Sequence, residues 1–282
     1  MTPAMVLNGV APFALNIGDG IDWIRSLPAE SVDLVVTDPP YESLERHRAK
    51  GTTTRLSHSE GSSNDWFQTI PNARLPDLLD GIYRALRPRR HAYILADEET
   101  TDLLKLLAPL SGLYPWKTLV WVKVVQDADL EELSRTLDGE DSVRAGTGYH
   151  YRAANERILL LEKRSVRIPA ALFGAPPLPR ISLTPKEDPP GEGLQLNDRA
   201  TPDVLFAPGI RRGYPTEKPV ELLRTLVSQS TQPGEVVVDL GAGSGATGVA
   251  TLELGRRVLL CELKPSQEDP IRSRLIATRP RP

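Results

Sequence analysis

The amino-acid sequence predicts an α/β fold built on a mainly parallel β-sheet. Short apolar segments alternate with longer segments of helical apolar spacing, which is the pattern of strand–helix–strand units. Two of the apolar segments run directly into distinctive turns, LVVTDPPY at 34–41 and VVVDLGAGSG at 236–245. With 282 residues, 40% hydrophobic and 25% charged, the chain is long enough to bury a sizeable core. We expect one large domain over residues 1–282.

The expected elements follow from the periodicity of each segment in turn. FALNIGD is typical of a short strand that ends in a turn at Gly18 and Asp19, and the next residues place Ile21, Ile24 and Leu27 at helical spacing. The expected strands lie at 13–19, 32–37, 91–97, 118–125, 155–163, 236–238 and 258–262. The expected helices lie at 20–27, 75–87, 100–110 and 217–230, with one more after the glycine-rich turn.

Three segments depart from this alternation. Residues 42–65 are polar and basic in their first half, which predicts a long functional or mobile loop. Residues 127–141 are acidic and predict a solvated surface helix and loop. Residues 165–213 carry many of the 26 prolines and no clear periodicity, so we expect an irregular insertion that is either a linker or a recognition element.

Composition excludes several classes of protein. A single cysteine, Cys261, cannot form an internal disulfide, and its apolar neighbours indicate a small buried core residue in a protein of a reducing compartment. The four histidines are scattered and no Cys/His cluster has metal-ligand spacing, so we expect no metal. We find no signal peptide and no apolar run that could span a bilayer, which favours a cytoplasmic location without membrane contact. A net charge of −3 argues against a general polyanion binder but leaves local basic patches open.

The DPPY segment at 38–41 combines a carboxylate, a stiff turn and an aromatic ring. A buried strand ends at Asp38, and Pro39 and Pro40 then fix the backbone direction before Tyr41. A turn former and a plain core aromatic are the structural interpretations of Asp38 and Tyr41. The functional interpretation is a site in which the carboxylate and the ring contact the same ligand.

The glycine-rich turn predicts a ligand site at the end of a second buried strand. Gly241, Gly243 and Gly245 allow a tight turn and a close approach to a ligand, and the free N–H groups of the following helix face it. Glu262, at the tip of the next strand, is well placed to accept hydrogen bonds from ribose hydroxyls. An ordinary strand–helix turn and a dinucleotide site are the alternatives, since GAGSGA satisfies G-x-G-x-x-G/A. Asp239 would repel a phosphate but could pair with a cationic or amino ligand, which favours S-adenosylmethionine (SAM).

The two turns together, with YPTEKPVELLRTLV before the second, resemble the DNA amino-methyltransferases that modify N6 of adenine or N4 of cytosine. The catalytic tetrapeptide precedes the glycine-rich turn here, and that permuted order resembles the β group of the family. The resemblance covers residues 13–163 and 213–264. It implies a SAM-dependent methyltransferase fold, which is Rossmann-like with helices on both faces of the sheet.

The resemblance also implies roles for individual residues. An exocyclic base amine is a poor nucleophile and needs acceptors for its two N–H groups; Asp38 and the Pro39 carbonyl would supply them, next to Pro40. Tyr41 would stack on a base flipped out of duplex DNA. The methyl group would pass in line from sulfur to nitrogen without a covalent enzyme intermediate. The residues implied to hold SAM are Asp19, Asp38, Lys218, Asp239, Gly241, Gly243, Gly245 and Glu262.

Partners are implied with less detail. Double-stranded DNA is the expected substrate, in a nucleoid-associated location, and dimerisation is common in the β group, so a homodimer is a further expectation. The stretch 165–213 occupies the place where this group carries target recognition. The residues expected to contact DNA are Arg46, Arg48, Lys50, Arg55, Arg211 and Arg212.

Several functions stay open as alternatives. DPPY is more frequent in the adenine subset of the family, so N6-adenine is favoured over N4-cytosine. Methylation of RNA or of a protein amide uses related tetrapeptides, but those relatives usually carry the glycine-rich turn first. A non-catalytic DNA-binding relative would not need an intact Asp38 with three intact glycines, and a dinucleotide oxidoreductase would leave DPPY unexplained.

Overall fold

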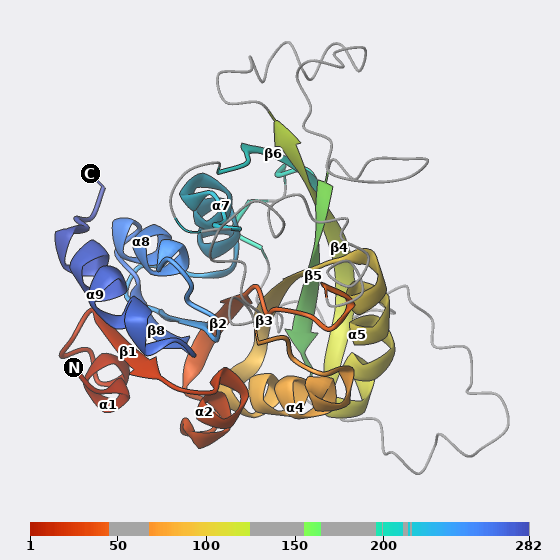
Figure 1. The fold of residues 1–282 in the computed structure, drawn as a ribbon, viewed down its shortest axis with the longest axis horizontal. Helices are drawn as coiled ribbons and strands as arrows, with labels where there is room; N and C mark the ends of the chain where they lie inside the picture. Colours follow the sequence, from red (N-terminus) through yellow and green to blue (C-terminus); the bar gives the residue numbers. More distant parts are fainter. Residues whose placement is uncertain are drawn as a thin grey trace, which may run out of the picture.

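The computed structural model describes residues 1–44, 68–124, 155–164, 196–198, 200–210, 214 and 216–281. Within them, eight strands form one sheet in the order β1-β8-β7-β2-β3-β5-β4-β6 (Figure 1). The strands are β1 (Phe13–Ile17), β2 (Val32–Thr37), β3 (Leu86–Ala96), β4 (Leu113–Val124), β5 (Asn155–Lys163), β6 (Val204–Pro208), β7 (Val236–Asp239) and β8 (Arg257–Glu262). Neighbouring strands run parallel except at β5, which is antiparallel to both β3 and β4. The mainly parallel sheet expected from the sequence is confirmed.

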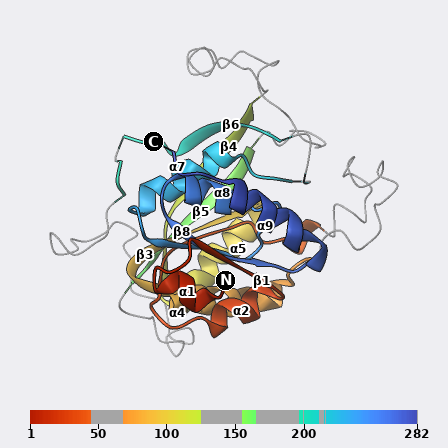
Figure 2. The ribbon, with the colours of Figure 1, turned by 90° about the vertical axis from the view of Figure 1, so that its left-hand side faces the viewer.

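Helices cover both faces of the sheet, as Figure 2 shows edge-on. The first face carries α1, α2, α4 and α5, and the second carries α7, α8 and α9. The helices are α1 (Pro3–Leu7), α2 (Gly20–Ser26), α4 (Leu75–Ala85), α5 (Glu98–Ser111), α7 (Val220–Ser230), α8 (Ala246–Glu253) and α9 (Glu268–Ala277), with 3-10 turns η1 (Asn72–Arg74) and η3 (Pro265–Gln267). None of these described helices is long and apolar enough to cross a membrane.

The core lies in two apolar layers, one on each side of the sheet. Val35 of β2 packs into the layer beneath α2, α4 and α5, whereas Val36 packs into the layer beneath α7 and α8. Successive residues of a strand point to opposite faces, so a strand covered on both faces is mostly apolar and buries any polar side chain that it carries. Every residue of β2 is buried accordingly, including Asp33.

Asp33 holds three strands together at the start of β2. Its side chain is 1% exposed, accepts a hydrogen bond from the backbone N–H of Val236 at 2.9 Å, and pairs with Arg87 at 2.5 Å and Arg90 at 3.3 Å. A buried carboxylate is tolerated only when it is paired and hydrogen-bonded. Asp33 therefore ties β2 to the first residue of β7 and to β3.

The expected strands and helices are present where the structure describes them, but two strands begin early, and one strand, β6, and two helices, α1 and α9, were not expected. β3 begins at Leu86 and β4 at Leu113, each five residues earlier than expected, because pairing with neighbouring strands extends them beyond their apolar segments. β6 was not expected, since Val204–Pro208 lies in the proline-rich stretch 165–213. It is a five-residue edge strand, and parallel pairing with β4 organises it. The segments 127–141 and most of 42–65 and 165–213 lie outside the described residues.

Gly20 is the point where α2 meets the end of β7. A Cβ atom built on Gly20 would lie 2.3 Å from the carbonyl oxygen of Leu240, so a side chain cannot be accommodated without moving the backbone. This contact holds the turn after β1 against the turn after β7. The two turns predicted to bind a ligand are thereby packed together.

We predict that Gly20→Ala lowers the free energy of unfolding by about 1–3 kcal/mol, the usual cost of overpacking. In an isolated helix, Gly→Ala is stabilising. A loss of stability in Gly20→Ala would therefore come from the contact with Leu240. Urea denaturation measures the effect. Gly209→Ala is the control, because its Cβ would meet no atom of the described residues nearer than 4.0 Å. Equal stability of the two variants would contradict the close approach.

Candidate active site

The predicted site residues gather at the carboxyl edge of the parallel strands. Asp38 directly follows β2 and Asp239 ends β7, and these strands are paired neighbours with Val35 opposite Val238. Asp19 follows β1 and Glu262 ends β8, which are paired with Ile17 opposite Glu262. Because parallel strands end at the same edge, two motifs that lie far apart in the sequence meet here.

The glycine-rich turn lies against the DPPY turn. A Cβ on Gly241 would lie 3.6 Å from the carbonyl oxygen of Asp38, so the backbones of the two turns are close to van der Waals contact. Gly243 has φ of 54°, and its Cβ would lie 3.0 Å from the ring of Tyr214. Gly245 has φ of 81° and is the N-cap of α8. The left-handed backbone at both positions explains why glycine stands there.

Hydrogen bonds hold the DPPY turn from the side of residues 70–72. The carbonyl oxygen of Pro40 accepts from the N–H of Ile70 at 2.6 Å, and the Glu42 carboxylate accepts from the N–H of Asn72 at 2.6 Å. Tyr41 is half-buried and packs against the apolar layer of α2, α4 and α5. With the Pro40 carbonyl engaged, the Pro39 carbonyl accepts no hydrogen bond from any residue in the described ranges.

A line of alternating charges runs from Asp38 into the sheet. The ammonium of Lys218 contacts Oδ2 of Asp38 in a short ion pair and lies 3.4 Å from Oε2 of Glu156. Oε1 of Glu156 pairs in turn with Lys123. Oδ1 of Asp38 has no partner among the residues that the structure describes. The Lys218 side chain is 10% exposed, and those of Asp38 and Glu156 are 28% and 24% exposed.

The pKa directions follow from this arrangement. Burial raises the pKa of Asp38, against the opposing charge of Lys218. Burial also disfavours the charges of Lys218 and Glu156, but their partners outweigh it: the pKa of Lys218 is raised by Asp38 and Glu156, and the pKa of Glu156 is lowered by Lys218 and Lys123. Lys218 and Glu156 are therefore ionised near neutral pH.

Two further buried carboxylates line the glycine-rich turn. Asp239 is 3% exposed, and burial raises its pKa to about 6, although its Oδ1 accepts from the N–H of Gly241 at 3.1 Å. Glu262 accepts from the N–H groups of Gly243 at 2.7 Å and Lys264 at 3.0 Å. Asp38, Asp239 and Glu262 suit a ligand that carries positive charge and amino groups, which is the chemistry of SAM.

Asp19 is occupied by local interactions. Its Oδ1 accepts from the N–H groups of Ile21 and Asp22, which makes it the N-cap of α2, and its Oδ2 pairs with Arg74 at 2.6 Å. Burial disfavours its charge, but the Arg74 guanidinium and the N-cap bonds bring the net pKa of Asp19 below its ordinary value. A cofactor contact of Asp19 stays a prediction.

The structure adds residues that the sequence did not indicate. Glu156 pairs with Lys218 and Arg74 pairs with Asp19, Lys123 pairs with Glu156, and Tyr214 lies against Gly243. Glu156 is near the start of β5, and because β5 is antiparallel to both of its neighbours, Glu156 lies at the carboxyl edge of the parallel strands. The predicted DNA-contacting residues Arg46, Arg48, Lys50, Arg55, Arg211 and Arg212 lie outside the described residues.

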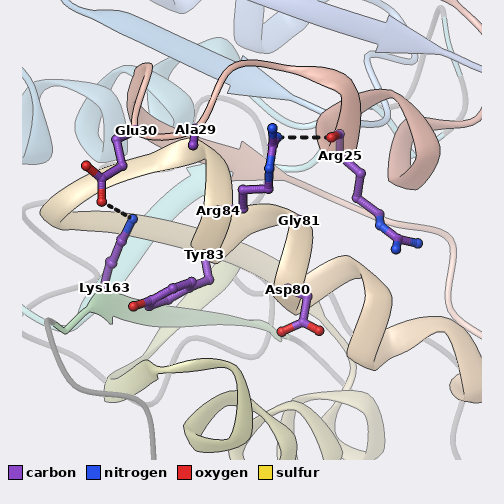
Figure 3. Close-up of a pocket in the computed structure, with 8 residues that line it drawn as sticks. All are labelled: Arg25, Ala29, Glu30, Asp80, Gly81, Tyr83, Arg84 and Lys163. Carbon is purple, nitrogen blue, oxygen red and sulfur yellow. Dashed lines mark hydrogen bonds and ion pairs between the residues drawn. The ribbon is translucent and has the colours of Figure 1, made fainter.

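Other features carry no comparable chemistry. Cys261 is fully buried, as expected for a core residue. No group of three or more His, Cys, Asp or Glu side chains that could hold a metal gathers in the described ranges. A groove of about 390 Å³ is lined by the end of α2 and the turn after it, by α4, and by Lys163 at the end of β5 (Figure 3). Its Lys163 pairs with Glu30 at 3.1 Å, and its Arg84 donates to the carbonyl of Arg25 at 3.0 Å.

Comparisons with known proteins identify the family of the chain. A DNA methylase family, that of the N6 and N4 methyltransferases, matches residues 32–272. The DNA adenine methyltransferase YhdJ of Escherichia coli (strain K12) is 25% identical over 261 residues, which cover 87% of this chain and 76% of YhdJ.

Solved structures share the fold. A DNA modification methylase of Thermus thermophilus, TTHA0409, complexed with S-adenosyl-L-methionine, superposes with a TM-score of 0.58 at 20% identity over 95% of each chain. The cytosine-N4-specific PvuII DNA methyltransferase has a TM-score of 0.55 at 15% identity, over 90% of this chain and 83% of its own. The fold is that of the DNA methyltransferases, and the family match extends from the second strand to the last helix. The chain belongs to the N6/N4 family of DNA methylases and is a SAM-dependent DNA methyltransferase.

Proposed function

We propose that this enzyme is a site-specific methyltransferase that modifies the exocyclic N6 of adenine in duplex DNA, on a base turned out of the helix. One observation carries the proposal. Asp38, the first residue of the DPPY turn, lies against the glycine-rich turn, with Oδ2 held by Lys218 and Oδ1 open among the described residues. A carboxylate with one anchored and one open oxygen is suited to accept an N–H of an amine.

Methyl transfer to an exocyclic amine requires two hydrogen-bond acceptors near the same nitrogen. The lone pair of an exocyclic amine is delocalised into the ring, and acceptors on both N–H groups localise it on nitrogen. Oδ1 of Asp38 would be the first acceptor. The Pro39 carbonyl would be the second, because the Pro40 carbonyl is already bound to the N–H of Ile70. The proline backbone keeps this acceptor in a fixed direction.

The glycine-rich turn would hold the cofactor beside this nitrogen. SAM supplies an electrophilic methyl group on a positively charged sulfur. Asp239 would pair with the positive charge of the ligand, Glu262 would face the ribose, and Gly241 and Gly243 allow a close approach. Asp38 would also favour positive charge at its side of the site. The residues thus bring the amine and the methyl donor together, which is the main source of rate in such a transfer.

Tyr41 would receive the target base. Its ring is half-buried, and the core packing behind it fixes its orientation. A base must leave the duplex to reach a site of this kind, and stacking on an aromatic ring offsets part of the lost base stacking. Two hydrogen bonds hold the chain near Tyr41, one on each side of residues 45–67. The Ser43 hydroxyl donates to the Asp97 carboxylate at 2.5 Å, and the N–H of Ile70 donates to the Pro40 carbonyl. Basic residues of this segment are the ones we propose to contact DNA, with Arg211 and Arg212.

Adenine is proposed as the base because DPPY is typical of the adenine subset and because YhdJ is named as an adenine methyltransferase. Cytosine N4 is the second candidate, since the PvuII enzyme with the same fold is cytosine-N4-specific. Both bases present the same amine chemistry to Asp38. The homodimer and the cytoplasmic location remain predictions.

We expect the purified enzyme to transfer label from methyl-labelled SAM to unmethylated duplex DNA, and the label to appear as N6-methyladenine after digestion to nucleosides. Asp38→Ala should lower the rate roughly 100- to 1,000-fold, as expected when one group that stabilises the transition state is lost. Asp269→Ala, a change at an exposed aspartate on α9, is the control and should leave the rate unchanged. Label in N4-methylcytosine would show that the target is cytosine N4 and would overturn the choice of adenine. An enzyme that binds SAM but labels no DNA would refute the proposal.

We also expect the affinity for SAM to rise with pH between about 5 and 7. The pKa of Asp239 is raised to about 6 by burial, so protonation at lower pH removes the negative charge that a cationic ligand needs. Each pH unit below about 6 should weaken binding by up to about tenfold, and binding should level off above about 7. Calorimetric titration measures this. Asp239→Asn should bind weakly and with a flatter pH profile; an identical slope in both proteins would exclude Asp239 as the group.

A further inference from the structure

We propose that Glu156 is a positioning residue of the methyl transfer, which holds the ammonium of Lys218 at Oδ2 of Asp38 so that Oδ1 stays open for the target amine. This inference rests on the proposed function and extends it to a residue outside both motifs. Glu156 would act through Lys218 rather than by touching the base or the cofactor.

The hydrogen-bond donors of Lys218 are matched by the acceptors around it. A lysine ammonium has three N–H donors. Three acceptors surround it: Oδ2 of Asp38, the carbonyl oxygen of Thr216 at 3.2 Å, and Oε2 of Glu156 at 3.4 Å. With each donor directed to one acceptor, none is left to reach the other oxygen of Asp38.

The shape of the lysine side chain makes the position of its ammonium depend on its neighbours. Its ammonium is a compact charge on a flexible stem with no preferred plane, so its position depends on the groups around it. Without Glu156, Asp38 would be its only carboxylate partner in this cluster. The ammonium would then be free to bridge both oxygens of Asp38, and the acceptor intended for the amine would be blocked. Glu156 on the far side balances that pull.

Strand pairing and a second lysine hold Glu156 itself in place. Because β5 is antiparallel to β3, its first residues lie at the carboxyl edge of the neighbouring strands, with Arg157 opposite Ala96. Glu156 lies opposite Trp121 of β4, and Lys123, two residues further along β4, points to the same face and pairs with Oε1. The Lys123 ammonium also lies 5.3 Å from the centre of the Trp121 ring. Each oxygen of Glu156 therefore has its own cation.

The test compares Glu156→Gln with the wild type in steady-state methylation of duplex DNA. Glutamine keeps the shape of the side chain and removes the charge. We expect kcat to fall on the order of 100-fold, as for a misplaced catalytic group, whereas KM for DNA and the dissociation constant of S-adenosylhomocysteine stay within about threefold. Glu156→Asp should recover part of kcat. A fall in kcat below about threefold would overturn the inference.

A matched control excludes a general loss of stability. Glu253→Gln removes the charge of a carboxylate of similar exposure, 19%, which also pairs with two cations, Arg224 and Arg281, outside the site. Its kcat should match that of the wild type. Thermal unfolding of both variants is measured alongside, and a Glu156→Gln protein that unfolds below the assay temperature is assayed at lower temperature, beside Glu156→Asp.

A double-mutant cycle tests the route through Lys218. Single-turnover methylation with labelled SAM is measured for Glu156→Gln, Lys218→Met and the double variant. If Glu156 acts through Lys218, adding Glu156→Gln to Lys218→Met changes the rate by less than about twofold. An equal effect of Glu156→Gln in both backgrounds would overturn the inference.

A measurement without DNA separates this inference from the proposed function. In protein labelled with ¹³C and ¹⁵N at lysine, the side-chain resonance of Lys218 is assigned by its absence in Lys218→Met. We expect this resonance to shift in Glu156→Gln and to stay unchanged in Glu253→Gln. A wild type that methylates no DNA, together with a shifted resonance, would refute the proposed function and keep the positioning of Lys218. An unshifted resonance would overturn that positioning whatever the substrate is.

Discussion

The parallel pairing of β2 with β7 is the constraint on which the site depends. The two strands come from opposite ends of the chain, and their pairing brings the turn after Thr37 beside the turn after Asp239. Asp33 reinforces it by joining the start of β2 to Val236 and to two arginines of β3. At the other end of the same strand pair, Gly241 lies against the backbone of Asp38. The two motifs therefore meet in one site although about 200 residues separate them in the sequence.

Three carboxylates at this edge have different partners, and the partners set what each can do. Glu262 is bound by the N–H groups of Gly243 and Lys264, and Asp239 by Gly241, so both are held by the backbone. Of the three, Asp38 alone is paired with a buried lysine in the described part of the chain. A backbone N–H holds a carboxylate in place without cancelling its charge, which suits a residue facing a cation. A lysine fixes one oxygen of Asp38, and the other is the acceptor that we propose for a neutral amine.

Much of this architecture could be predicted from the sequence because its signals are local. VDLVVT predicts a buried strand, and the glycines at 241, 243 and 245 predict a tight turn after the next buried strand; the structure has both, with left-handed backbone at Gly243 and Gly245. β6 and the early starts of β3 and β4 could not be predicted, since pairing with neighbours rather than their own residues organises them. Glu156 was missed for a related reason. Nothing in NERILLLEK shows that the strand is reversed, and the reversal decides at which edge Glu156 lies.

The central claim is that the open oxygen of Asp38 accepts the amine of a base taken out of the duplex. The most direct measurement is a crystal structure of the enzyme with S-adenosylhomocysteine and a duplex that carries its target site. We predict that an adenine lies outside the DNA duplex and stacks on Tyr41. Its N6 should lie within hydrogen-bond distance of Oδ1 of Asp38 and of the Pro39 carbonyl. A target base that remains paired in the duplex, or an amine bound away from Asp38, would contradict it.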